Sequence, residues 1–365
     1  MLKLFLAAAL SISSLLAVTP AMADDEQADR PLTIAVFGDW PYSQNLLDRA
    51  DLLINSINND RDVSLVMHLG DIHSGSMPCT SAGILPPLPS SNPGWNQAVF
   101  HVFQQFNAPV VYTPGDNEWS DCHKSKQLSS GAPLKELASV RSLFFSQPGR
   151  TLGGAPMAVA SQGLMADAAH PTDAQFIENV MWVKSKVVFA TFNIPGGSND
   201  DASQWSGSFS DPIAQVQEMV VREAANLRWL DATFERAQKA HARAVVIGVQ
   251  ADMWDPEAIA AGGAGLSNYT PFVRKLADLS LRFQQPVLVL NGDTHRLLVD
   301  QPLAVPSSAT GVIHGTAPVP NLTRIVVQGS TNSPAEWLRL HIDPRDPKVF
   351  SWTNVPYCAN PVGGC

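Results

Sequence analysis

Four apolar runs, each ending in Gly-Asp, decide the expected fold of this chain: TIAVFGDW (residues 33–40), LVMHLGDI (65–72), VVYTPGDNEW (110–119) and VLVLNGDTH (287–295). Each run is typical of a buried β-strand. Each Gly-Asp therefore places a carboxylate just past the carboxyl end of a strand, where open α/β sheets build their binding sites. Four carboxylates in one crevice would repel each other unless several were protonated or a cation lay between them. The sequence thus predicts a metal site that contains Asp39, Asp71, Asp116 and Asp293.

The first residues predict export. The stretch MLKLFLAAALSISSLLAVTPAMA carries one basic residue, Lys3, a short apolar stretch, and Ala-Met-Ala ahead of an acidic run that begins at Asp24. This pattern is typical of a secretory signal peptide cleaved after Ala23, and its apolar run is short for a membrane-spanning helix. We therefore predict a signal peptide over residues 1–23, a single domain over 24–365, no membrane span, and a periplasmic or secreted location.

The charge balance limits the class of ligand. The chain has 24 lysine and arginine residues against 33 aspartate and glutamate residues, and one of the basic residues, Lys3, lies in the predicted signal peptide. A net negative protein is a poor match for the phosphates of a nucleic acid duplex, although a local metal centre can still bind one phosphate group. The expected partner is a small phosphorylated substrate. The oligomeric state does not follow from the sequence.

All four cysteines lie in the part of the chain that is predicted to be exported, which favours two disulfides. Four cysteines allow three connectivities, so the pairing does not follow from the sequence alone. We favour Cys79 with Cys122, because both follow Gly-Asp strand ends, and Cys358 with Cys365, which closes a short terminal loop. A cysteine-ligated zinc site is the alternative, but the chain has no Cys-x-x-Cys spacing.

Apolar periodicity predicts strands that alternate with helices, which is an α/β pattern. Strands are expected over 31–37, 63–69, 109–113, 187–193, 244–249 and 286–290. Helices are expected over 44–59, 95–106, 134–145, 211–241 and 271–283. Beyond Asp293 the pattern changes to strands without helices, over 322–327, 336–342 and 348–353.

The order and spacing of the four Gly-Asp motifs resemble those of the calcineurin-like metallophosphoesterases, which include purple acid phosphatases, nucleotidases and phosphodiesterases. In that family five blocks, Asp-x-His, Gly-Asp-x-x-Asp, Gly-Asn-His-Asp/Glu, a lone His after a strand, and Gly-His-x-His, hold two metal ions about 3.5 to 4 Å apart. The resemblance covers nearly the whole mature chain. It implies a four-layer α/β/β/α sandwich of two mixed β-sheets and a pair of bound ions.

The first three blocks align with departures. Asp39 fits the first ligand, and the Gly-Asp-Trp start without a following histidine resembles purple acid phosphatases. Asp71 fits the bridging carboxylate, but Ser74 stands where Asp or Tyr is expected, so an iron site of the purple acid type is in question. In the third block Asp116 takes the place of the ligand Asn and Asn117 that of the catalytic His. Asparagine can donate a hydrogen bond to a phosphoryl oxygen, but it cannot deliver a proton.

The last two blocks also differ from the family pattern. Gln250 stands at the position of the lone histidine, Asp293 replaces the first histidine of the fifth block, and His295 keeps the second. The resemblance then implies one site at Asp39, Asp71 and His295, and a second site at Asp71, Asp116, Gln250 and Asp293. Oxygen ligands dominate both sites, which favours Mn, Mg, Ca or Fe over zinc.

The reaction that the resemblance implies is hydrolysis of a phosphate mono- or diester by a metal-bound hydroxide. We take Asn117 as a catalytic candidate. His73 and His123 lie next to motif residues, and either could replace the missing proton donor; of the two we favour His123. An exposed loop histidine is the alternative interpretation of His123. Two other functions stay open: a catalytically eroded fold that acts as an exported metal- or ligand-binding protein, and an extracellular module stabilised by calcium.

Overall fold

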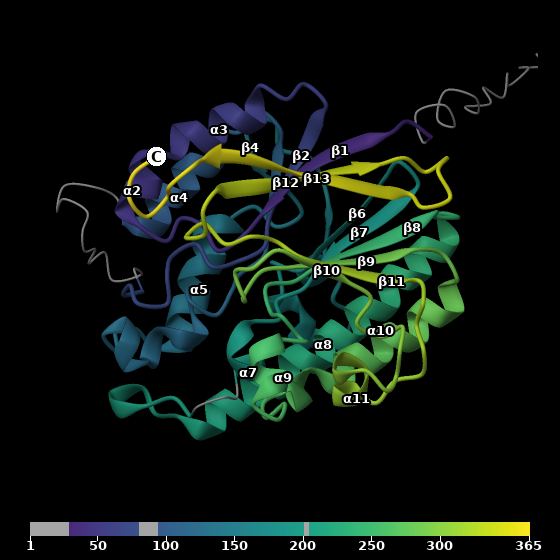
Figure 1. Ribbon diagram of the computed structural model, residues 1–365. Helices are drawn as coiled ribbons and strands as arrows, with labels where there is room; N and C mark the ends of the chain where they lie inside the picture. Colours follow the sequence, from purple (N-terminus) through teal and green to yellow (C-terminus); the bar gives the residue numbers. More distant parts are fainter. Residues whose placement is uncertain (1–28, 80–93, 201–203) are drawn as a thin grey trace, which may run out of the picture.

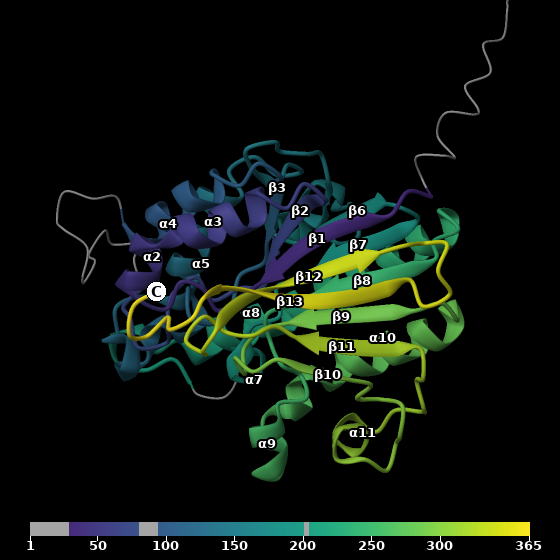
Figure 2. The same cartoon turned by 45° about the horizontal axis from the view of Figure 1, so that its top comes forward.

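The computed structural model describes residues 29–79, 94–200 and 204–365. The predicted signal peptide, residues 1–23, lies outside the described residues and stays a prediction. Two mixed β-sheets lie face to face in the middle of the molecule, and helices cover the outer face of each (Figure 1). Figure 2 shows the same layers after a rotation of 45°. This arrangement confirms the predicted four-layer α/β/β/α sandwich.

In the described residues the first sheet has six strands. Its centre is parallel, from β1 to β2 to β3, whereas β12, β13 and β4 are antiparallel to their neighbours. Every residue of β1 is buried, because both faces of the sheet are covered. In spatial order the strands are β13 (Phe350–Cys358), β12 (Ala335–Ile342), β1 (Leu32–Phe37), β2 (Val63–His68), β3 (Pro109–Tyr112) and β4 (Leu152–Gly153).

The second sheet has seven strands in the described residues. Strands β7, β8, β9 and β11 are parallel, while the outer strands β5, β6 and β10 run antiparallel to their neighbours. In spatial order the strands are β10 (Leu298–Asp300), β11 (Leu322–Val326), β9 (Val287–Asn291), β8 (Ala244–Gly248), β7 (Val187–Thr191), β6 (Val180–Lys184) and β5 (Ala160–Ser161).

The longest helix begins and ends as local capping rules predict. In this helix, α8, Asp211 accepts a hydrogen bond from the backbone N–H of Ala214, Pro212 occupies the first turn, and Arg236 and Lys239 lie in the last turn. The α-helices are α2 (Gln44–Asp48), α3 (Ala50–Asn58), α4 (Trp95–Phe103), α5 (Pro133–Phe144), α6 (Gln162–Met165), α7 (Gly196–Asp200), α8 (Pro212–Lys239), α9 (Pro256–Ala260), α10 (Thr270–Phe283) and α11 (Ala309–His314). The 3₁₀ helices are η1 (Ser120–His123), η2 (Ser125–Gln127), η3 (Pro171–Gln175), η4 (Gly207–Phe209) and η5 (Leu266–Tyr269).

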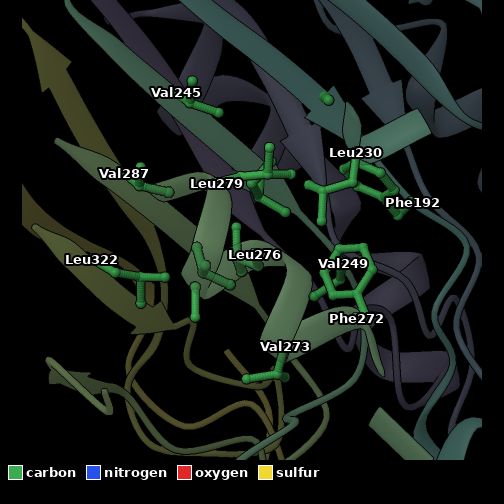
Figure 3. Close-up of a cluster of buried hydrophobic side chains, with 14 of the residues drawn as sticks. Phe192, Leu230, Val245, Val249, Phe272, Val273, Leu276, Leu279, Val287 and Leu322 are labelled. Carbon is green, nitrogen blue, oxygen red and sulfur yellow. The ribbon is translucent and has the colours of Figure 1, made fainter. Parts of the chain in front are cut away.

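Three apolar clusters join the four layers. One lies between the sheets, the second packs α3, α4 and α5 on the first sheet, and the third packs α8 and α10 on the second. Figure 3 shows the third cluster, in which Leu276 and Leu279 of α10 face Val245 and Val287 of the sheet. Burial of each such side chain contributes about 1.5–3 kcal/mol, so the clusters fix the strand ends that carry the Gly-Asp motifs.

The structure corrects three details of the sequence prediction. The expected helix over 44–59 is divided at Arg49, whose φ of −106° and ψ of 22° leave the helical region. The apolar residues before and after Arg49 keep the spacing of one continuous helix, so the sequence contained no sign of a break there. Strand β6 was missed because the hairpin to β7 turns at Ser185 and Lys186, with φ values of 52° and 51° and no glycine. The segment beyond Asp293 contains a short helix, α11, although only strands were expected.

The favoured cysteine pairing is confirmed, because Cys79 is bonded to Cys122 and Cys358 to Cys365. The first bond ties the segment after Asp71 to the segment after Asp116. None of the helices in the described residues combines the length and the apolar character that crossing a membrane requires.

Loss of the Cys79–Cys122 bond should destabilise the chain more than loss of the Cys358–Cys365 bond, because their sequence separations are 43 and 7 residues. Loop-closure entropy gives about 4 kcal/mol for the longer loop and about 2.5 kcal/mol for the shorter one. Urea unfolding of Cys79→Ala with Cys122→Ala, compared with Cys358→Ala with Cys365→Ala, measures the difference. Equal losses in free energy of unfolding would contradict this expectation.

Candidate metal centre

The structure brings the four Gly-Asp carboxylates to one edge of the two sheets. Asp39, Asp71 and Asp116 follow the parallel strands β1, β2 and β3, and Asp293 follows β9 of the second sheet. The first three are buried, while Asp293 is partly exposed. The backbone N–H of Asp293 donates to Asp39 Oδ1 over 3.2 Å, so the two sheets meet at this point.

Asp39, Asp71 and His295 form a group that could hold a metal ion. One ligand atom from each lies within 4.8 Å of the other two, and His295 Nε2 is 3.3 Å from Asp39 Oδ1. Asp39 is fully buried, yet its Oδ2 has no hydrogen-bond partner. A buried carboxylate oxygen without a donor is costly, so this donor set fits a divalent cation.

Tyr42 completes this group, and the sequence analysis missed it. Its hydroxyl lies 2.9 Å from Asp71 Oδ2, 3.2 Å from Asp39 Oδ1 and 3.2 Å from His295 Nε2. The spacing Asp39-x-x-Tyr42 in one loop was the signal that could have identified it. Burial, followed by the charges of Asp71 and Asp39, raises the pKa of Tyr42 well above its ordinary value.

Gln250 lies between Asp71 and Asp116, with its amide nitrogen toward them. Nε2 donates to Asp71 Oδ2 and to Asp116 Oδ1, each over 3.2 Å. The backbone N–H of Gly196 donates to Gln250 Oε1 and so fixes this orientation of the amide. The amide oxygen that was predicted to ligate a metal therefore faces the backbone of α7 instead.

Glycines allow the close approach of these carboxylates. A Cβ on Gly115 would lie 2.0 Å from Asp71 Oδ1, and a Cβ on Gly196 would lie 2.8 Å from Asp293 Oδ1 and 3.0 Å from Asp116 Oδ2. A Cβ carbon does not come so close to an oxygen to which it is not covalently bonded. A side chain at either position would therefore displace the carboxylates.

The two catalytic candidates occupy different surroundings. Asn117 lies within the site, where its Nδ2 donates to Asp71 Oδ2 over 3.0 Å and to the Tyr42 hydroxyl over 3.1 Å. His123 ends η1, and its Nδ1 accepts from the backbone N–H of Ser206 over 3.2 Å. Among the described residues, the hydrogen bonds of its side chain reach only Ser206. Both catalytic roles stay predictions.

Glu118 holds the loops of the second and third motifs together. Its Oε1 accepts from the Tyr112 hydroxyl over 2.6 Å, from the N–H of Gly115 over 2.7 Å, and from the N–H of Asp71 over 3.2 Å. Burial raises the pKa of Glu118 to about 7, against the opposing effect of the Gly115 and Tyr112 hydrogen bonds. This carboxyl therefore positions Asp71 through its backbone.

Asp71, Asp116 and Asp293 have raised pKa values, so they hold their protons to higher pH when no cation balances them. Burial, and then the charges of Asp116 and Glu118, raise the pKa of Asp71 well above its ordinary value. Burial and the charge of Asp116 do the same to the pKa of Asp293. Burial and nearby Asp121 raise the pKa of Asp116 to about 6. A divalent cation would replace these protons.

His295 behaves differently from the carboxyls. Burial acts to lower the pKa of its imidazole, but the hydrogen bond and the negative charge of Asp39 outweigh burial and raise that pKa above the usual value. Its side chain is 38% exposed. His295 therefore faces solvent at the rim of the site while Asp39 is buried beneath it.

Backbone strain is concentrated at the site. Asp39, Asp71, Asp293 and His295 have φ values of 49°, 60°, 77° and 62°, in the left-handed region that residues with a side chain seldom adopt. Each such residue costs about 1–3 kcal/mol and persists only where its surroundings hold it. The hydrogen bond from Asp39 N–H to Gly70 O, 3.0 Å long, is one of these restraints.

Helix α7 is a left-handed turn beside the site. Gly197, Ser198 and Asn199 have φ and ψ close to 60° and 40°, and Asp200 follows with a φ of 69°. Fully buried Arg222 of α8 donates through Nη2 to Asn199 O over 3.1 Å, and its Nη1 also donates to the Asn199 side chain. The N–H of Asn199 donates to the Tyr269 hydroxyl over 3.0 Å.

A cavity of about 540 Å³ opens beside Asp293. Its lining is mainly polar, and Ser198 of the left-handed turn forms part of its wall. Hydroxyl, amide and carboxyl groups line it, contributed by Ser198, Asp252, Asp255, Ser267, Asn268 and Tyr269. The carboxylate edge therefore lies next to a space that could accept part of a small polar molecule.

Comparison with known proteins identifies the family of this chain. Residues 32–216 match the sequence profile of the calcineurin-like phosphoesterases. The chain belongs to this family. The match includes Asp39, Asp71 and Asp116 and ends before Gln250, Asp293 and His295. A solved structure of GAP50, described as the anchor in the inner membrane complex of Plasmodium, is 11% identical, with 90% of each chain covered and a TM-score of 0.43. No curated protein matches the chain.

The ion-free calcineurin-like phosphoesterase should lose stability as the pH rises. The pKa of Asp116 is about 6 and that of Glu118 about 7 in the folded chain, against ordinary values of 3.8 and 4.5. The folded chain thus binds more protons than the unfolded chain within this window, and its free energy of unfolding falls as the pH increases through it. Added Mn²⁺ should therefore raise Tm more near pH 8 than near pH 5.

Thermal melts of the chelator-treated chain, with and without Mn²⁺, measure both effects. Glu118→Gln keeps Oε1 as an acceptor but does not titrate, so its Tm should fall less steeply between about pH 5 and pH 8. A Tm that rises with pH in the ion-free chain would show that the carboxyls are ionised without a cation.

Proposed function

We propose that this chain is a metal-dependent phosphoesterase that hydrolyses a phosphate mono- or diester of a small molecule. The observation that carries the proposal is the group formed by Asp39, Asp71 and His295, whose donor atoms lie within 4.8 Å of one another. Asp39 and Asp71 follow strands within the family match, and the polar cavity begins at Asp293, whose backbone N–H donates to Asp39. The unpartnered Oδ2 of buried Asp39 supports a cation there.

The residues of the site have distinct roles in this proposal. Asp39, Asp71 and His295 hold the ion, which when bound would acidify a water molecule and stabilise the charge that develops at phosphorus. Asn117 can position a phosphoryl oxygen through Nδ2, although it cannot supply a proton. Protonation of the leaving group would require a histidine such as His123 or a solvent molecule.

The number of ions bears on the proposal. The family resemblance implies a second ion at Asp71, Asp116, Gln250 and Asp293, of Mn, Mg, Ca or Fe in preference to zinc. In this chain the Gln250 amide nitrogen is directed at two of those carboxylates. The proposed activity therefore rests on the group formed by Asp39, Asp71 and His295.

The cavity beside Asp293 suggests where the leaving group lies. Its carboxyl, hydroxyl and amide groups suit a leaving group that carries hydroxyl or amino donors. We propose a small phosphorylated metabolite rather than a nucleic acid duplex, in keeping with the net charge of −9. Two disulfides support an oxidising compartment, periplasmic or extracellular.

A second function is favoured by one specific observation. Asn117 and Gln250, which stand where relatives have histidines, both direct amide nitrogens at Asp71. These two hydrogen bonds occupy Asp71 Oδ2, an oxygen that a catalytic metal ion would otherwise use. An exported binding protein that keeps the fold and an ion is therefore the alternative.

Hydrolysis of aryl phosphate mono- and diesters tests the proposal. The chelator-treated chain should regain activity with Mn²⁺, and Asp71→Ala should reduce kcat/KM by at least about 100-fold, because loss of a direct ligand exceeds the 10- to 100-fold effect of outer-shell partners. Asp278→Ala removes an exposed carboxylate of α10 and serves as the matched control.

The outcomes separate the two functions. Full activity in Asp71→Ala would remove the basis for the phosphoesterase assignment. Tight Mn²⁺ binding by the wild-type chain, without turnover of any ester in a broad panel, would favour the binding protein.

A further inference from the structure

The Tyr42 hydroxyl makes more polar contacts than its single proton can serve. It lies 2.9 Å from Asp71 Oδ2 and 3.2 Å from both Asp39 Oδ1 and His295 Nε2. A phenol has one O–H to donate. The Tyr42 proton therefore joins the hydroxyl to only one of Asp71 and Asp39. The other contact needs either a proton on a carboxyl or a cation between the oxygens.

The separations around Tyr42 match those of ligands that share one ion. Metal–ligand bonds of about 2.1 Å place neighbouring ligand atoms about 3.0 Å apart in octahedral geometry and about 3.4 Å apart in tetrahedral geometry. The three Tyr42 contacts, and the 3.3 Å between His295 Nε2 and Asp39 Oδ1, fall in or close to this range. Tyr42 Oη thus stands at a fourth ligand position beside Asp39, Asp71 and His295.

The place of a second ion is occupied by a hydrogen-bond donor. Gln250 Nε2 is 3.2 Å from Asp71 Oδ2 and 3.2 Å from Asp116 Oδ1, the two carboxylates that a second cation would join. An amide NH₂ carries hydrogens and offers no lone pair to a metal. A flip of the amide would set Gln250 Oε1 against both carboxylates and leave the N–H of Gly196 without its acceptor.

We propose that this phosphoesterase holds one cation instead of the pair that its family resemblance implies. Tyr42 is the fourth protein ligand, with Asp39, Asp71 and His295, and the Gln250 amide takes the place of the second ion by joining Asp71 to Asp116. The inference rests on the proposed function for its metal site. It departs from the family resemblance in the ion count, and it adds Tyr42 to the ligand set of the proposed function.

Calorimetry and elemental analysis of the full chain with Mn²⁺ test the ion count. We expect one ion per wild-type chain. Gln250→Glu replaces the donor with a carboxylate oxygen of the same shape and should add a second ion, whereas Gln217→Glu, an exposed change on α8, should not. Gln250→His provides the same test with a neutral ligand if Gln250→Glu does not fold.

A hydroxyl deletion tests the ligand set. Tyr42→Phe keeps the ring and removes the oxygen, so it should weaken Mn²⁺ binding by about tenfold or more. Ser139→Ala removes a hydroxyl of α5 that donates to Lys135 O and should leave the affinity unchanged. Unchanged or tighter binding in Tyr42→Phe would overturn the assignment, and tighter binding would show that the phenol blocks the ion.

The results distinguish this inference from the proposed function. Two ions in an active wild-type chain would overturn the one-ion centre and keep the phosphoesterase. One ion that depends on Tyr42, without hydrolysis, would keep the centre and reject the phosphoesterase. Absence of Mn²⁺ binding would reject both.

Discussion

Burial of negative charge at the shared edge of the two sheets is the constraint on which the other features of the site depend. Removing an ionised carboxylate from water costs several kcal/mol unless donors or a cation compensate it. The chain supplies donors from the backbone of Asp293 and from the amides of Asn117 and Gln250. Glycines 115 and 196 leave room for the carboxylates, and strained backbone at the strand ends directs them inward. The apolar clusters between the layers hold this strain in place.

The layered fold could be predicted from sequence because its strands are buried on both faces. A run such as residues 33–37 has no polar alternation, and this is the pattern of a strand covered by a helix on one side and a second sheet on the other. The same logic identified the carboxylates after β1, β2, β3 and β9. The meeting of Asp39, Asp71 and Asp116 follows from the parallel order of β1, β2 and β3, whereas Asp293 joins them because β9 of the second sheet ends at the same edge.

The details of the site depend on contacts between distant segments, which leave no periodic pattern. The orientation of the Gln250 amide is set by the N–H of Gly196, 54 residues away. Tyr42 is three residues from Asp39, but its role depends on Asp71 and His295 as well. The type and position of a residue in the sequence were enough to identify candidate ligands. The direction in which each side chain points its donors and lone pairs depends on packing and could be determined only from the structure. For this reason the sequence predicted Gln250 as a metal ligand through its amide oxygen, whereas in the structure its amide nitrogen donates hydrogen bonds instead.

The left-handed turn at residues 197–200 limits how the specificity of this protein can diverge. Its conformation is the mirror image of an ordinary helical turn, so most side chains at these positions would destabilise it. The turn is held from α8 by Arg222, which also lies over the ring of Trp119 at 5.5 Å. A substitution of Ser198, in the cavity wall, therefore also affects the contacts of Arg222, although Arg222 lies on α8 and does not line the cavity. Under the proposed function, relatives that accept other leaving groups at this cavity would have to replace the turn and its arginine together.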